Sequence, residues 1–162
     1  GGTALCWAWD LAKSYDWTWG VALDANGVVT RSERWQGPWQ TTIERIAAIT
    51  DAPALVDSTG VGDPVLEALQ KHDRRKFEGF KFTSASKQQI MEGLAVALQR
   101  REVKFSDPVR KAELESFEYE YTRTGVRYEA PSGLHDDGVC ALALAVHHHS
   151  RARTPGDLGV TI

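Results

Sequence analysis

The first 35 residues are dominated by apolar runs that are rich in aromatic and β-branched side chains, a composition typical of strands. These runs occupy residues 4–10, 17–23 and 28–35. Asn26-Gly27, between the second and third runs, is a strong signal for a hairpin turn. We therefore expect three antiparallel strands to open the fold.

After residue 40, apolar positions recur with helical spacing and alternate with short buried runs. Thr41 and Glu44 have the spacing of a capping box, which predicts a helix start, and Ser86 and Gln89 repeat it. Helices are predicted over residues 41–49, 63–70, 86–101, 107–116 and from about 136 onward, with strands at 54–57, 77–82 and 103–105 and a hairpin over 117–130.

This order predicts an α/β fold. Three antiparallel strands followed by parallel strands form one mixed sheet, helices flank it, and a β-hairpin is added. We expect a single domain over residues 1–150. Residues 151–162 combine arginine, proline and glycine and are predicted to be a flexible C-terminal tail.

Composition narrows the functional classes. No apolar run approaches the roughly 20 residues that a membrane-spanning helix needs. The net charge of −3 is not that of a generally basic nucleic-acid binder, so any DNA contact must come from a local basic face. Cys6 and Cys140 are predicted to be small core residues in a reducing cytosol. The run of histidines at 147–149 is expected at a solvent-exposed helix end.

Acidic residues end or follow apolar runs at three distant places. Asp10 ends the first predicted strand, Asp57 ends the strand at 54–57, and Asp136-Asp137 begin the last helix. A carboxylate at the end of a buried strand is costly unless something pairs with it. Each acid alone would be explained by a turn or a cap, but the three placements together predict a metal site at one edge of the sheet.

Phosphodiester hydrolysis is the chemistry that such a site favours. Two hard cations about 4 Å apart activate a water and stabilise the leaving oxygen, and carboxylates are their natural ligands. Asp10 is expected to bridge two Mg²⁺ or Mn²⁺ ions, Asp57 to hold one, and Asp136 or Asp137 to hold the other. Asp137 is the first choice of that pair.

Four motifs in this order resemble the C-terminal nuclease domain of tailed-bacteriophage large terminase subunits, within the RNase H/RuvC-like superfamily. They are WDLAKSYDWT at 9–18, VDSTGVGDPV at 56–65, FTSASK at 82–87 and GLHDD at 133–137. The resemblance reaches to about residue 149. It implies a metal-dependent endonuclease that cuts concatemeric double-stranded phage DNA during genome packaging in the host cell cytoplasm. The family's acids correspond to Asp10, Asp57 and the Asp136-Asp137 pair, and His135 is a possible second-shell group or ligand.

The resemblance also implies partners. In the full-length protein these are an N-terminal ATPase domain, the portal ring and the small terminase subunit. No G-x-x-x-x-G-K-[ST] phosphate-binding loop is present in this sequence. We therefore expect an excised domain that cuts DNA without hydrolysing ATP.

Four basic residues are candidate DNA contacts, each with an ordinary alternative. Lys13 follows the first acid, and Lys87 opens a predicted helix beside a strand end; a solvated lysine is an equally good interpretation of either. Arg123 and Arg127 lie in the predicted hairpin, and a hairpin lies beside the active site in the family.

Three functions remain open from the sequence. The first is the terminase endonuclease, and the second is a junction resolvase or RNase H of the same fold. The third is a non-catalytic module that docks on the portal or on DNA. Cutting of plain linear duplex DNA would favour the first over the second, and an Asp10→Asn variant that binds but does not cut would exclude the third.

Overall fold

The protein is built on a five-stranded mixed sheet. The computed structural model describes residues 3–11, 17–59, 63–105 and 136–161. The sheet has the order β3-β2-β1-β4-β5, antiparallel between β3, β2 and β1 and parallel between β1, β4 and β5. Its strands are β1 (Ala4–Asp10), β2 (Thr18–Asp24), β3 (Val29–Trp35), β4 (Ala54–Asp57) and β5 (Phe77–Phe80). The predicted α/β class, with a three-stranded antiparallel part followed by parallel strands, is confirmed.

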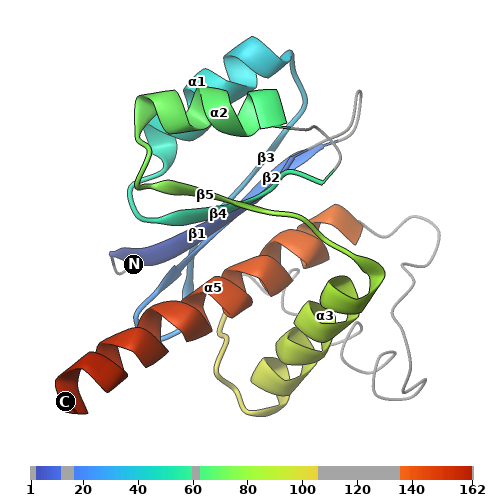
Figure 1. The fold of residues 1–162 in the computed structure, drawn as a ribbon. Coiled ribbons are helices and arrows are strands. Elements are labelled where there is room, and N and C mark those ends of the chain that lie inside the picture. The colour runs from blue at the N-terminus through green and yellow to red at the C-terminus, as the bar shows by residue number, and fades with distance from the viewer. Residues whose placement is uncertain (1–2, 12–16, 60–62, 106–135, 162) are drawn as a thin grey trace.

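Helices cover both faces of the sheet. Figure 1 shows α1 and α2 on one face and α3 and α5 on the other. The helices are α1 (Trp39–Ile49), α2 (Asp63–His72), α3 (Ser84–Gln99) and α5 (Asp136–Thr161). Helix α5 continues beyond residue 150, the predicted end of the domain. Within the described ranges, no helix has both the length and the apolar character needed to cross a bilayer.

The α1/α2 face is packed with large aromatic rings. Trp7 and Trp9 are fully buried and stack with their ring centroids 5.3 Å apart. Trp35 meets Trp9 edge-on at 5.4 Å. Gly20 opposes Trp9 across β1 and β2, and a side chain at this glycine would collide with the indole ring. The absence of a side chain at Gly20 thus makes room for the largest ring of this core.

The indole N–H of each buried tryptophan on that face has a hydrogen-bond acceptor. Trp9 donates to the Thr50 hydroxyl at 3.0 Å and Trp35 donates to the Thr42 hydroxyl at 3.0 Å. Trp7 donates to a carboxylate oxygen of Asp51 at 2.7 Å. A buried donor without a partner would cost about 1–3 kcal/mol, so these bonds are what allows tryptophan to fill this core.

The buried core of the α3/α5 face consists mostly of small and aliphatic side chains, with Trp19 among them. Residues 141–145 of α5 are all buried, and they lie against Cys6, Ala8 and Leu55 of the sheet. Both cysteines are buried thiols, as predicted. Burial raises the pKa of the Cys6 thiol to about 12, so this group is a packing residue rather than a nucleophile.

The predicted hairpin turn is confirmed. Gly27 adopts a positive φ of 80°, and its N–H donates to the Asp24 carbonyl oxygen at 3.1 Å. The short strand predicted at 103–105 is present as a single parallel bridge between Val28 and Lys104. The helix predicted over 107–116 and the hairpin predicted over 117–130 lie outside the described residues.

Both predicted capping boxes were placed incorrectly. Helix α1 begins at Trp39 after Pro38, and the described residues provide no side-chain cap. Helix α3 has a capping box one turn earlier than expected, formed by Thr83 and Ser86. The spacing rule identified Ser86 as the N-cap, but Ser86 occupies the N3 position of the capping box. A glutamate or glutamine usually occupies N3, and here the serine hydroxyl makes the same hydrogen bond to the N-cap backbone.

The prediction of an exposed helix end at residues 147–149 was also wrong. These histidines lie in the middle of α5, because the helix continues to Thr161. His149 is buried, and its Nε2 lies 2.9 Å from the Asp24 carbonyl oxygen. His148 Nδ1 lies 3.1 Å from the Trp7 carbonyl oxygen. The imidazoles therefore fasten α5 to β1 and to the end of β2.

Candidate functional site

Asp10 and Asp57 lie next to each other at one edge of the sheet. They end β1 and β4, which are parallel neighbours, and their Cα atoms are register partners. Adjacent strands are about 4.8 Å apart, so the two carboxylates start from neighbouring backbone positions. In open α/β sheets this edge, at the carboxyl ends of the strands, is where ligands bind.

Both acids face α3 and α5. Side chains alternate between the two faces along a strand, and Ala8 and Leu55, two residues before each acid, belong to the α3/α5 core. Asp10 and Asp57 are half-buried. They are therefore shielded by the fold on one side and accessible to solvent on the other.

The Asp57 carboxylate is oriented by the turn that follows it. One of its oxygens accepts a hydrogen bond from the Thr59 backbone N–H at 2.9 Å. The Thr59 hydroxyl in turn accepts from the Phe82 backbone N–H at 2.7 Å. This chain of hydrogen bonds ties the exit of β4 to the exit of β5 and fixes the direction of the carboxylate.

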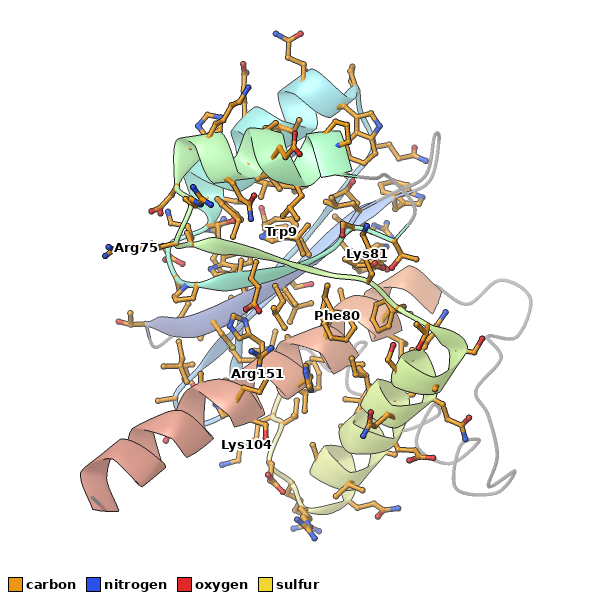
Figure 2. All side chains as sticks on the ribbon, viewed as in Figure 1. Trp9, Arg75, Phe80, Lys81, Lys104 and Arg151 are labelled. Atoms are coloured by element: carbon orange, nitrogen blue, oxygen red, sulfur yellow. The ribbon has the colours of Figure 1, made fainter. Side chains whose placement is uncertain are left out.

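The two acids are the centre of a single row that crosses the whole sheet. Trp19 is the register partner of Asp10, Arg34 is the partner of Trp19, and Phe80 is the partner of Asp57. We call Arg34, Trp19, Asp10, Asp57 and Phe80 the cross-strand row. Figure 2 shows Phe80 between β5 and α5. Trp19, Arg34 and Phe80 were not singled out from the sequence, although the hairpin at Asn26-Gly27 fixes the pairing that brings the first two together.

The start of α5 lies against this row. A methyl group added at Gly138 would come within 3.1 Å of the Trp19 ring, so the first turn of the helix contacts the indole closely. Since Trp19 is the register partner of Asp10, the backbone of Asp136 and Asp137 begins the helix beside the same edge. The side chains of these two acids lie outside the described part of the structure.

The other predicted site residues are distributed as follows. Lys87 is exposed in the first turn of α3, which follows β5 and so begins at the same edge of the sheet as the acids. His135, Lys13, Arg123 and Arg127 lie outside the described residues.

Asp10 and Asp57 suit a hard divalent cation. Carboxylate oxygens are the ligands that Mg²⁺ and Mn²⁺ prefer, and these two groups share a face and are half-exposed. Among the side chains that the structure describes, no three histidine, cysteine or acidic groups gather closely enough to hold a metal. The side chains of the acids at the start of α5 are not among those described.

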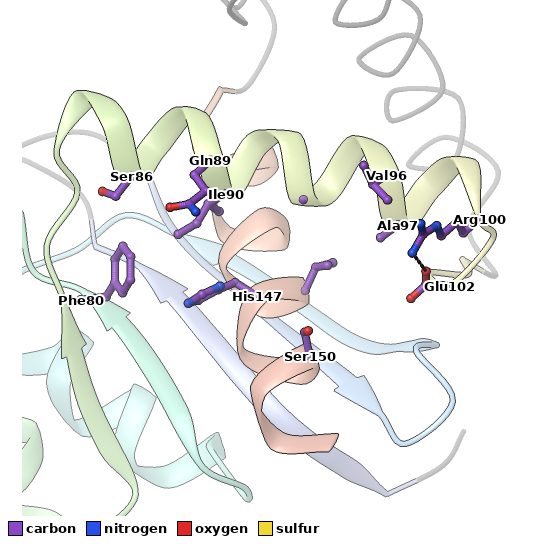
Figure 3. Close-up of a pocket in the computed structure, with 12 residues that line it drawn as sticks. Phe80, Ser86, Gln89, Ile90, Val96, Ala97, Arg100, Glu102, His147 and Ser150 are labelled. Atoms are coloured by element: carbon purple, nitrogen blue, oxygen red, sulfur yellow. Dashed lines mark ion pairs between the residues drawn. The ribbon is translucent and has the colours of Figure 1, made fainter. Parts of the chain in front are cut away.

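A cavity of about 630 Å³ lies on the same face, between α3 and α5. Figure 3 shows Phe80 and His147 at one end of it and the ion pair between Arg100 and Glu102 at the other. The ring of Phe80 packs edge-on against His147, with centroids 5.7 Å apart. Phe80 thus lines the cavity and is also the member of the cross-strand row paired with Asp57.

Comparison with known proteins finds related sequences among phage terminases. The large terminase subunits of Thermus phage G20c and Thermus virus P23-45 are each 29% identical to this chain over 154 aligned positions. The match covers 86% of this chain but 30% of the length of each relative. None of the protein-family models that were compared matches the chain.

Solved structures give a closer match in fold. The large terminase nuclease of thermophilic phage G20c with bound magnesium has a TM-score of 0.74 at 25% sequence identity, covering 89% of this chain and 80% of that one. The same nuclease with bound cobalt has a TM-score of 0.70 at 25% identity and the same coverage. The resemblance predicted from the sequence is thus confirmed: over most of its length this chain is a homologue of the terminase large subunit, and it has the RNase H-like fold of the large terminase nuclease.

Proposed function

We propose that this chain is a divalent-metal-dependent endonuclease that cuts double-stranded phage DNA, releasing genome lengths from a concatemer during packaging. The observation that carries the proposal is the register pairing of Asp10 with Asp57, with the start of α5 beside them. The sequence relatives and the metal-bound nuclease structures support it. RNase H or four-way-junction cutting by the same fold is the alternative that substrate choice must exclude.

In this proposal the acids form the metal site and the fold fixes their spacing. Asp10 and Asp57 would hold two Mg²⁺ or Mn²⁺ ions together with Asp137 or Asp136. When bound, the two ions would supply an activated water and neutralise charge on the leaving oxygen. In hydrolysis the water oxygen forms a new bond to phosphorus, the bond from phosphorus to the leaving sugar oxygen breaks, and that oxygen takes up a proton.

The residues around the acids prepare them for this role. The Thr59 N–H holds one oxygen of Asp57, leaving the carboxylate with a fixed direction before any cation arrives. The N-terminal end of α5 carries a partial positive charge, which stabilises carboxylates in its first turn. His135 would act beside the ligands, and Lys87, Lys13, Arg123 and Arg127 would contact DNA.

The wider setting is part of the proposal. The chain spans about 30% of the length of the curated relatives it matches. In a complete terminase we expect an N-terminal ATPase domain to feed DNA to this nuclease. The portal ring and the small terminase subunit would be its partners in the cytoplasm of the host cell.

Nicking of supercoiled plasmid tests the proposal. We expect cleavage with Mn²⁺ or Mg²⁺, none in excess chelator, and none with Ca²⁺, which takes looser and higher coordination. Asp10→Asn and Asp57→Asn should each abolish cleavage while DNA binding survives. Asp73→Asn is the matched control, because Asp73 is an exposed loop carboxylate after α2 and away from the cross-strand row. Cleavage that persists in chelator, or in Asp10→Asn, would contradict the proposal.

Substrate choice separates the alternatives. The same assay on linear duplex, a four-way junction and an RNA–DNA hybrid should give cutting of the linear duplex. Strict preference for the junction or for the hybrid would instead support the resolvase or the RNase H. Binding without cutting on every substrate, in all the cations, would support a docking module.

A further inference from the structure

Arg34 occupies the β3 end of the cross-strand row. Its Cα is the register partner of Trp19, which is itself the partner of Asp10. Two strand spacings, roughly 10 Å, therefore separate the backbone of Arg34 from that of Asp10. Its side chain is exposed and lies on the α3/α5 face, the face of the two acids.

Two indole rings hold the Arg34 guanidinium. The guanidinium carbon lies 4.4 Å from the centroid of Trp17 and 5.2 Å from the centroid of Trp19. A guanidinium can contact an aromatic ring through its flat face while its N–H groups, at the edge of that plane, remain able to donate. Those N–H groups form the fork that binds a phosphate through two parallel hydrogen bonds.

Two other arginines stack on tryptophans, but on the opposite face. Arg31 lies 5.5 Å from the ring centroid of Trp7, and Arg45 lies 4.1 Å from that of Trp35. Both also approach the carboxylate of Glu33, at 3.5 and 3.9 Å. Side-chain alternation along β3 places Arg31 and Glu33 on the α1/α2 face and Arg34 on the face of the acids. Arg31 thus lies on the same strand as Arg34 and also contacts a tryptophan ring, but it is on the opposite face of the sheet from the acids.

A positive charge beside the two acids would offset their repulsion of DNA phosphates, and Arg34 carries such a charge. Asp10 and Asp57 repel the phosphates of DNA, and the chain as a whole carries a charge of −3. Metal ions would neutralise the acids at the phosphate being cut, but not the phosphates on either side of it. The roughly 10 Å between the backbones of Asp10 and Arg34 is enough to separate the phosphate being cut from a neighbouring phosphate of the same strand.

We propose that Arg34, whose guanidinium lies over the rings of Trp17 and Trp19, binds a phosphate of the DNA backbone close to the one that is cut. The inference deepens the proposed nuclease function, because it assigns a substrate contact to that same site. Rigid stacking sets where the guanidinium fork lies before DNA arrives, so the contact aligns the strand with Asp10 as well as attracting it.

Salt-dependent binding of duplex DNA tests this role directly. Fluorescence anisotropy with a labelled duplex of about 25 base pairs is measured in Ca²⁺, and a gel confirms that the duplex stays intact. In Arg34→Gln we expect a Kd raised roughly tenfold at low salt. The slope of log K against log salt should become shallower by about 0.9, which reduces the affinity lost between 50 and 200 mM salt by roughly threefold to fourfold.

Two further variants separate the phosphate contact from a general charge effect. Arg31→Gln removes the same charge from the same strand on the other face, and its Kd and slope should equal those of the wild type. Arg34→Lys keeps the charge but lacks the planar fork, so it should keep the slope and recover only part of the affinity. Thermal melting of each variant confirms that the fold is intact.

The outcomes are distinct from those of the cleavage assay. If Arg34→Gln matches the wild type in Kd and slope, or if Arg31→Gln weakens binding equally, the inference is wrong whether or not the chain cuts DNA. A wild-type chain that fails to bind duplex DNA also overturns it. If the chain binds DNA through Arg34 but never cuts it, the inference stands and the proposed nuclease function fails.

Discussion

The two faces of the sheet are packed on different principles. On the α1/α2 face, Trp7, Trp9 and Phe77 are fully buried, and indole N–H groups are satisfied by side chains such as Thr50. Figure 2 shows Trp9 between the sheet and these helices. On the α3/α5 face, the buried run at 141–145 is mostly alanine and leucine, which lets α5 approach the sheet closely.

This difference assigns the two faces different tasks. Large rings with satisfied polar atoms give the α1/α2 face a dense core that holds the strands in register. The α3/α5 face carries the half-buried acids, the histidines of α5 and the cavity beside Phe80. Under the proposed function, the chemistry takes place on the face of the acids while the other face mainly supplies stability, and the variants below test that separation.

The largest effect is expected from Trp9→Ala. Removing a fully buried indole should lower the free energy of unfolding by about 3–5 kcal/mol, because a cavity is left beneath α1 and α2. Urea denaturation measures it. Trp39→Ala, at the partly buried margin of the same core, is the control and should cost clearly less. Equal losses in the two variants would show that this core is not the main source of stability.

Thr50→Val tests the polar part of the same core. The change keeps the shape of the side chain but leaves the Trp9 indole N–H without its acceptor, so we expect a loss of about 1–3 kcal/mol. Thr30→Val is the control, since Thr30 is only partly buried and its hydroxyl makes a long 3.5 Å bond. Its effect should stay within about 0.5 kcal/mol. Unfolding curves that match for the two variants would contradict this reasoning.

On the other face, Gly138→Ala should affect activity more than stability. The added methyl group would press on Trp19 at 3.1 Å and displace the start of α5 by a few tenths of an ångström. We expect cleavage to fall roughly tenfold to a hundredfold, because the acids of the first turn move with the helix. In Gly93→Ala on α3 the methyl group meets nothing within 4 Å, so cleavage should be unchanged and stability should rise by about 0.5–1 kcal/mol. Full cleavage activity in Gly138→Ala would show that the position of the start of α5 does not matter for cleavage.

The smallest effect is a pH dependence that originates in α5. Burial lowers the pKa of His148, and burial followed by the charge of Arg151 lowers that of His147. The unfolded chain, with histidine pKa values near 6.5, therefore binds more protons in the window below that pH. Their contribution to stability is complete above about pH 6.5 and is lost as the pH falls toward the lower folded-state pKa values.

Thermal melting between pH 7.5 and 5.5 measures this dependence. We expect His148→Gln to reduce the fall in Tm on acidification, while His72→Gln, an exposed histidine at the end of α2, leaves it unchanged. An identical fall in Tm for the wild type and His148→Gln would assign the acid sensitivity to other groups.

Much of the fold could be predicted because local signals agreed with tertiary packing. The strand at 4–10, the Asn26-Gly27 turn and the strand at 54–57 occur where they were expected. Asp10 and Asp57 were predicted to lie at one edge of the sheet because both end strands, and the register pairing places their Cα atoms opposite each other there. Their placement needed only the knowledge that parallel neighbours end at the same edge.

The features that were mispredicted depend on contacts between distant segments. Residues 147–149 looked polar in the sequence, but the carbonyl groups of Trp7 and Asp24 provide partners that no local pattern indicates. Helix α1 starts at Trp39 after Pro38, so Thr41 lies inside the helix and does not cap it. Arg34 was not predicted as a site residue for the same reason. Its position in the same cross-strand row as Asp10 follows only from the strand register.

The parallel pairing of β1 and β4 fixes the backbone spacing of the two acidic residues, Asp10 and Asp57. Main-chain hydrogen bonds, which are the same for every sequence, set the distance between Asp10 and Asp57. Loops beyond the strand ends can therefore differ in length and composition without changing the distance between the backbone positions of these two acids. The same argument applies to any chain of this fold, such as the relatives at 25–29% identity, that keeps β1 and β4 paired in parallel.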